Sequence, residues 1–492
     1  MHSYEELTSP ERELWNAYPT GRLVDLRTGD AEDNPENGDA WDAGRTIRAT
    51  VVAALLLGVH PGRPGAAPAL RLRGARISGD LDLSSAEIRH GLWFDECWFD
   101  RGASFYGAVT RTIEIKGSRI PGLDLTMARV EGRVSLRGTV VRGTLALMNA
   151  RVAGELILSR ATLSHPDDWA LFAGGLLVEG GVFCRRTTVY GGMRLLGAHI
   201  AGGLHMERAQ IHHPGAVALL ADSATVRTLM LSDAFTAHGA ISLRGVQIAD
   251  QLSFDGAVLD APDIALDCTQ MRVGVFVFTP VAPPSGLIDL QGAQVVTVRD
   301  RAGAWPGTVR LQGFTYGSLH EEDGSRTNSV AYRVSWIRRE SGFASQPYEQ
   351  LATWYRQIGR DDDARRVLLA KQRHRRRTLG RPARMWGHLL DATVGYGYRP
   401  WLAGVWLAAL ALLGTIVFSA HSPKPTQPGQ VPPFNAFVYT LDLLIPIGGL
   451  GQRSAWYWTG GATAWLAYAL IAAGWLLTTA ALAGVSRTLN KN

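Results

Sequence analysis

Apolar residues recur in one short phrase over residues 70–314 of the chain. The phrase reads Gly-Ala-x-Ile-x-Gly-x-Leu-x-Leu at residues 74–83, and it returns about every eleven residues, most regularly over residues 128–158. Apolar residues two apart, such as Leu145 and Leu147, indicate short strands whose side chains alternate in facing. A fixed short period of this kind predicts a stacked β-solenoid in which two periods make one coil.

The predicted fold class is mainly β, a right-handed-type β-solenoid with a half-coil of about 11 residues, over residues 69–318. One coil cannot bury its apolar face alone, so roughly eleven coils must stack. Residues 1–68 are expected to form a helical cap and a linker, with one helix that begins at Ser9 as N-cap and an amphipathic helix over residues 45–57. Such a cap would cover the unpaired edge of the first coil.

The phrase is interrupted at residues 164–169 and 211–215, which we expect to bulge out as loops. The pair His212 and His213 lies in the second interruption. We expect this pair to face solvent, since the sequence places no third ligand for a metal beside it.

The three cysteines, Cys97, Cys184 and Cys268, all lie inside the repeats and form no metal-binding or C-x-x-C spacing. Small buried side chains in the stack are the expected role, and a redox role is the alternative. No metal and no cofactor are predicted.

After the repeats, the apolar period changes from two to that of a helix. Residues 326–390 are expected to form a helical hairpin cap followed by a basic juxtamembrane segment, with helices over residues 330–339, 347–357 and 361–377. Sealing of the last coil is the expected role of the hairpin. A peptide-binding groove is the alternative, although a single hairpin forms no superhelical groove.

Residues 398–486 are expected to form a membrane domain with spans at about 401–419 and 462–484, both free of charged residues. At 1.5 Å per residue each span can cross a hydrocarbon core about 30 Å thick. Basic residues precede the first span and follow the second. The positive-inside rule therefore predicts a multi-pass protein of the plasma membrane with both termini in the cytoplasm.

The formal net charge of +6 and the pI of about 9.3 come almost entirely from arginine. Most arginines are spread among acidic residues, and one concentrated basic block precedes the first span: Lys371, Arg373, Arg375, Arg376, Arg377, Arg381 and Arg384. We expect this block to bind anionic membrane lipid. Nucleic acid is not expected as a partner, because no aromatic residues alternate with these arginines.

The segment between the spans, residues 434–452, is apolar up to a glycine-rich turn. Asp442 is the only acidic residue between the spans, and Pro446, Gly448, Gly449 and Gly451 shape the turn. A half-helix followed by irregular backbone is the layout of a re-entrant pore loop, and a pore of this kind is compatible with an oligomer. The alternative is a helix that lies on the membrane surface.

Several phrases resemble an actinobacterial family named membrane-associated oxidoreductase. They are the sequences at residues 11–15, 45–49, 55–58, 70–75, 347–352 and 370–373. The resemblance covers nearly the whole chain and implies a membrane-bound oxidoreductase, but it brings no catalytic residue or cofactor motif. The repeats are also similar to pentapeptide-repeat solenoids. No G-x-G-x-x-G, C-x-x-C-H or clustered cysteine ligands occur in the sequence.

Together these features predict a cytoplasmic β-solenoid tied to the membrane by two C-terminal spans. Its expected function is that of a binding or scaffold surface, or of a sensing module, with a possible protein partner on the solenoid. An ion channel or transporter-like pore built on residues 434–452 is the first alternative. The oxidoreductase of the family resemblance is the second.

Overall fold

The computed structural model describes residues 4–29, 33–60, 65–321, 329–380, 401–427, 432–446 and 449–489, together with residues 384, 385, 388, 391, 393 and 395. The chain divides into two compact units, Met1–Gln350 and Leu351–Asn492. Whether the four sequence segments fold as separate domains stays a prediction. Each unit is described below by itself.

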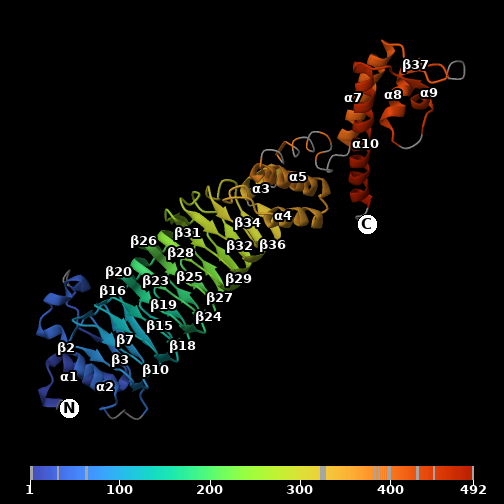
Figure 1. Cartoon of the computed structure of the whole chain (residues 1–492). Coiled ribbons are helices and arrows are strands. Elements are labelled where there is room, and N and C mark those ends of the chain that lie inside the picture. Colours follow the sequence, from blue (N-terminus) through green and yellow to red (C-terminus); the bar gives the residue numbers. More distant parts are fainter. Residues whose placement is uncertain are drawn as a thin grey trace. The chain divides into compact units, whose positions relative to one another are not determined.

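The first unit is a parallel β-solenoid of about 11 turns, which confirms the predicted fold class (Figure 1). One coil contains four short strands, β10 (Val109–Thr110), β11 (Ile113–Lys116), β12 (Arg119–Ile120) and β13 (Leu123–Asp124). Each strand pairs in parallel with the equivalent strand one coil later, so that Leu123 lies beside Leu145. Two eleven-residue periods therefore make one coil, and each period supplies two of its four strands.

The short strands of the first coils form four ladders, which two sheets share. The first sheet contains two of these ladders. One consists of β6 (Glu87–Ile88), β10, β14 (Arg129–Val130), β18 (Arg151–Val152), β21 (Leu177–Val178) and β24 (His199–Ile200). The other consists of β3 (Leu70–Arg73), β7 (Leu92–Asp95), β11, β15 (Val134–Ser135), β19 (Leu156–Ile157), β22 (Val182–Phe183) and β25 (Leu204–His205). The second sheet contains the other two ladders. One consists of β4 (Arg76–Ser78), β8 (Trp98–Phe99), β12 and β16 (Val140–Arg142), and the other consists of β5 (Leu81–Asp82), β9 (Ala103–Ser104), β13 and β17 (Leu145–Ala146).

In later coils neighbouring ladders fuse, because single strands continue across a corner with a shift of register. In the first sheet these strands are β27 (Thr225–Met230), β29 (Gln247–Ser253), β32 (Arg272–Phe278), β34 (Gln294–Asp300) and β36 (Thr315–Glu321). In the second sheet they are β20 (Thr162–Phe172), β23 (Thr188–Arg194), β26 (Gln210–Leu220) and β28 (Thr236–Ser242), followed by β30 (Val258–Asp260), β31 (Ile264–Asp267), β33 (Leu287–Asp289) and β35 (Val309–Arg310).

The two predicted loops at residues 164–169 and 211–215 are bulges inside strands β20 and β26. His212 is half-buried within β26 and stacks between Tyr190 and His238, with ring centroids 5.2 and 5.1 Å apart. His212 therefore lies within a strand and not in a loop, but like His213 it remains partly exposed to solvent. Equivalent positions on successive coils lie one rung apart, and this stacking places three rings in one column.

The N-terminal region covers the first coil with helices and also adds strands to it. Helix α1 (Ser9–Ala17) has Thr8 as its N-cap, one residue before the predicted cap. Residues 46–48 form β2 (Thr46–Arg48), which pairs with β4, and α2 (Ala49–Leu56) begins only after it. Strand β1 (Val24–Asp25) extends the other sheet by pairing with β3. These strands are too short to show an apolar alternation in the sequence.

Glu11 joins α1 to β2 through a buried carboxylate that accepts hydrogen bonds from the backbone N–H and the guanidinium of Arg48. Burial raises the pKa of Glu11, but the hydrogen bonds and the charge of Arg48 outweigh it and lower the pKa from 4.5 to about 2. A lowered folded-state pKa stabilises the fold above the unfolded-state value of 4.5.

We therefore expect the solenoid to lose up to about 3 kcal/mol through Glu11 as the pH falls from 4.5 to 2. Thermal melting at several pH values measures this effect. Glu11→Gln should be less stable at neutral pH and should show a flatter profile between pH 4.5 and 2. Glu13→Gln, which removes an exposed carboxylate from the same helix, should keep the wild-type profile. An unchanged profile in Glu11→Gln would contradict the assignment.

Two helices, α3 (Val330–Ile337) and α4 (Gln346–Gln357), follow the last coil. Their segment satisfies the N–H and C=O groups that the last strands would otherwise leave unpaired. Glu340 accepts from the N–H of Leu311 (3.0 Å) and Gln346 from that of Gly313 (3.0 Å), while Gln350 donates to the carbonyl of Tyr316 (2.8 Å). The segment therefore seals the last coil, as predicted, and blocks edge-to-edge pairing.

The second unit contains helices α5 (Asp361–Thr378), α7 (Trp401–Ser419), α8 (Ala436–Leu444), α9 (Gln452–Ala455) and α10 (Ala462–Leu489), and a small pair of strands, β37 (Lys424–Pro425) and β38 (Trp456–Tyr457). Helix α7 and residues 462–479 of α10 are long and apolar enough to cross a membrane. Helix α8 contacts both of them.

Candidate functional site

The segment between the two apolar helices begins with α8, a helix of nine residues. Asn435 caps it by accepting hydrogen bonds from the N–H groups of Phe437 and Val438 (3.1 Å each). The side chain of Gln452 accepts a hydrogen bond from the N–H of Asn435 and donates one to the carbonyl of Pro433. Gln452, which the sequence analysis did not single out, thus holds the two ends of the segment together. No pattern in the sequence indicates this bond, because its partners are backbone groups.

Asp442 is buried on α8, and both of its carboxylate oxygens are used inside the segment. Oδ1 accepts from the N–H of Leu450 (2.8 Å) and Oδ2 from the N–H of Arg453 (2.7 Å). The carboxylate therefore fixes the glycine-rich turn against α8 and supports the start of α9. A carboxylate whose two oxygens each accept from a backbone donor is positioned as a structural anchor.

The structure describes three of the four other candidate residues of the turn. Gly451 lies next to Asp442 in space and has a φ of +83°, a left-handed conformation that favours glycine at the start of α9. Pro446 is half-buried at the end of α8, and Gly449 is exposed. Gly448 lies outside the described residues.

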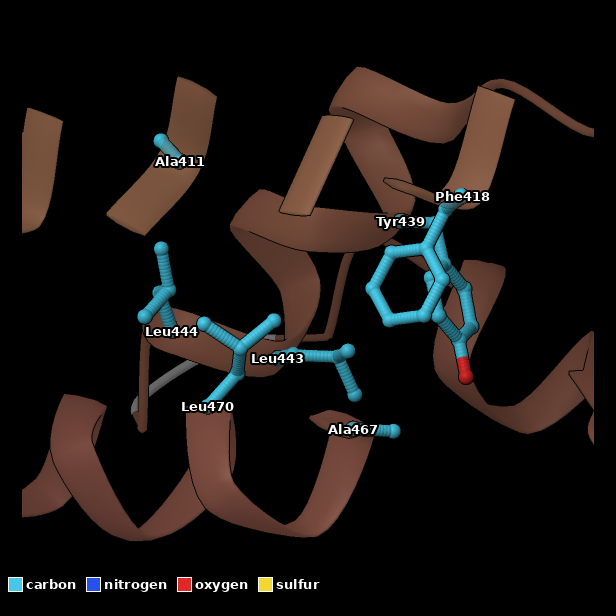
Figure 2. Close-up of a cluster of buried hydrophobic side chains, with 7 residues drawn as sticks. All are labelled: Ala411, Phe418, Tyr439, Leu443, Leu444, Ala467 and Leu470. Atoms are coloured by element: carbon cyan, nitrogen blue, oxygen red, sulfur yellow. The ribbon is translucent and has the colours of Figure 1, made fainter. Parts of the chain in front are cut away.

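Helix α8 lies between α7 and α10 and shares one apolar cluster with them (Figure 2). Phe418 and Tyr439 pack edge to face, with ring centroids 5.2 Å apart, and Leu444 lies near Ala411. A Cβ atom on Gly474 would stand 2.2 Å from the carbonyl oxygen of Leu444, so α10 approaches α8 at a distance that only glycine allows.

These contacts set the direction of α8. Its first turn meets Phe418, near the end of α7, and its last turn meets Ala411, seven positions earlier in the same helix. The chain therefore turns back along α7 after leaving it. Since a helix rises 1.5 Å per residue, α8 follows α7 for about 10 Å.

The basic block before α7 is partly neutralised within its own unit. Asp391 accepts three hydrogen bonds from Arg373 and one from Arg376 (3.1 Å). Burial raises the pKa of Asp391, but these arginines outweigh it and hold the pKa below its ordinary value. Arg375 and Arg377 are exposed, and Lys371 is half-buried. Arg384 donates to the carbonyls of Arg377 and Leu379, and Arg381 lies outside the described residues. The sequence does not indicate Asp391 as a partner of the basic block, because it lies 18 residues after Arg373 and 15 residues after Arg376.

The three cysteines are fully buried in the solenoid. Burial raises the pKa of Cys97 and of Cys184 to about 12, and it raises the pKa of Cys268 well above its ordinary value. All three thiols stay protonated at physiological pH, so they lack the thiolate that redox or metal chemistry needs. Within the described part of the chain, no three His, Cys, Asp or Glu side chains lie close enough to hold a metal ion.

No protein-family model matches the chain, and neither the curated proteins nor the solved structures contain a match to it.

Proposed function

We propose that the chain is a membrane-anchored binding scaffold, in which helices α7 and α10 hold a β-solenoid body at the inner face of the plasma membrane. The observation that carries the proposal is the apolar surface of these helices. Only 22% of each 18-residue apolar window is buried, and large side chains such as Trp401, Leu412 and Trp465 are exposed. Two uncharged 18-residue windows that expose this much apolar surface support a lipid environment for these helices.

Within this proposal, α8 enters the bilayer beside α7 and does not lie on its surface. It contacts α7 as far as Ala411, and it meets α10 at Gly474, twelve positions after the start of that helix. Asp442 then serves to satisfy the backbone of the returning turn, since unpaired N–H groups are costly in hydrocarbon. The flanking basic residues support a topology in which both termini lie in the cytoplasm.

The solenoid provides the binding surface in this arrangement. Rows of apolar side chains fill its interior. Its exposed side chains repeat along the stack, as in other repeat proteins that bind through an extended surface. The thiols, which are buried and protonated, offer no reactive group to the oxidoreductase chemistry that the family resemblance implies.

Cysteine labelling in intact cells tests the anchoring, because the three native cysteines are buried and should not react. We expect a membrane-impermeant maleimide to label Ser422→Cys, in the segment after α7, in intact cells. Ser341→Cys, exposed after α3, should react only after lysis. Labelling of both positions in intact cells, or recovery of the full chain in the soluble fraction, would overturn the proposal.

For the scaffold role, proximity labelling from the full chain should return the same protein partners in repeated experiments. The absence of a reproducible partner would contradict this role.

A further inference from the structure

One corner of the solenoid carries a groove of about 630 Å³ that is lined mainly by arginine. Five arginines from four successive coils contribute to it: Arg137, Arg160, Arg185, Arg186 and Arg208. The corner positions follow one another in register, since the N–H of Arg160 bonds the carbonyl of Arg185, and the N–H of Arg186 bonds that of Glu207. Neighbouring coils are about 4.8 Å apart.

The backbone at this corner is left-handed, with φ of +60° at Arg160, +55° at Arg186 and +60° at Arg208. On other coils the same corner is occupied by glycine, at Gly117, Gly138 and Gly256, or by Glu96. A left-handed conformation is strained for a non-glycine residue. Within the groove the sequence accepts this strain three times in succession and places a long cationic side chain at each position.

Two carboxylates neutralise two of the five arginines. Arg185 pairs with Glu207 (3.1 Å) and lies over the ring of Phe183, while Arg208 pairs with Asp233 (2.9 Å). Among the described residues, no carboxylate lies within ion-pair distance of the guanidinium groups of Arg137, Arg160 and Arg186. These three arginines are exposed and lie on neighbouring coils, so their positive charges are available to an anion that enters the groove.

We infer that this groove binds a ligand with two or more linked phosphate groups, of the di- or triphosphate class. Guanidinium groups bind phosphate oxygens in pairs, and a row of arginines spaced by one coil suits a row of linked anionic groups better than a single small anion. The volume lies within the range of small-molecule sites, about 300–1,000 Å³. The inference rests on the proposed binding role of the solenoid and names its ligand class, but it does not require the membrane anchor.

Calorimetric titration of the detergent-solubilised full chain with inorganic triphosphate, at about 0.15 M salt, tests the inference. We expect saturable one-site binding that Arg160→Gln/Arg186→Gln weakens at least tenfold. Glutamine is a suitable replacement, because Gln270 already adopts a φ of +58° at another corner of this solenoid. The matched control, Arg142→Gln/Arg151→Gln, removes two exposed arginines elsewhere on the same stack and should bind as the wild type does.

The melting temperatures of both double variants, measured without ligand, show that they are folded. Equal loss of binding in the control and the groove variant, or no saturable binding of triphosphate by the wild type up to millimolar concentration, would overturn the inference. Equal competition by sulfate at matched ionic strength would also overturn it, since this result would mean non-specific screening. None of these results changes the labelling pattern of Ser422→Cys and Ser341→Cys, so failure of the site and failure of the anchoring are distinguishable.

Discussion

Asp300→Ala should destabilise the C-terminal end of the solenoid by about 3 to 5 kcal/mol. Asp300, on β34, is 1% exposed and Arg333, on α3, is 0% exposed. The two side chains form a bidentate pair with N–O distances of 2.7 and 2.8 Å, and Trp305 also donates to Asp300 (2.8 Å). Alanine would remove this counter-charge and its two hydrogen bonds from a fully buried guanidinium. Chemical denaturation of the full chain gives the free energy, and hydrogen exchange in residues 330–337 locates the effect at α3.

Two controls separate this buried pair from an ordinary ion pair. Asp250→Ala removes the partner of Arg227 from an exposed pair and should cost less than about 1 kcal/mol. Asp300→Ala/Arg333→Met removes both charges and should recover much of the stability, because the uncompensated charge is gone. If Asp300→Ala and Asp250→Ala had equal effects, the pair would not hold α3 on the last coil.

Leu145→Asp should be the most damaging single change in the central coils, with a loss on the order of 3 kcal/mol or more. Leu145 is fully buried and lies between Leu123 and Leu171 of the neighbouring coils. An aspartate here would place a charge in an apolar ladder and remove the packing of both neighbours. Thermal melting of the detergent-solubilised full chain measures the loss.

Ala146→Asp is the matched control, because the next residue of the same strand is directed away from the interior and is only half-buried. Its effect should stay within about 0.5 kcal/mol. Melting of Leu145→Asp at the wild-type temperature would mean that the side chain of Leu145 does not face the core.

The eleven-residue period was enough to predict the coils, since apolar positions two apart force alternate residues of each strand inward. It was not enough to predict how strands fuse across corners in later coils or where strand β2 replaces the start of a helix. A two- or three-residue strand is stabilised by its neighbour in the stack and has no pattern of its own. The same reason explains His212, whose position in a column of rings depends on residues 22 and 26 positions away.

For the candidate functional residues too, the sequence shows the residue but not its partners. Asp442 was noticeable as the only acid between two apolar helices, yet its bonds to the N–H groups of Leu450 and Arg453 could not be read from the sequence. The groove arginines are spaced 26 and 22 residues apart, at 160, 186 and 208, and the sequence shows them as scattered charges. Only the coil length of each turn brings them to one corner.

By itself, the sequence determined the coil repeat, the helical sealing of the last coil and the two apolar helices, because each depends on the local order of apolar and polar residues. Tertiary structure decided which distant residues meet: Asp300 with Arg333, Arg373 with Asp391, α8 with Gly414 and Gly474, and the arginines of the groove. These contacts depend on coil length, corner bulges and close helix approach. Coils differ in length because bulges take up extra residues, so sequence spacing alone does not say which residues share a corner, and only the folded chain specifies these contacts.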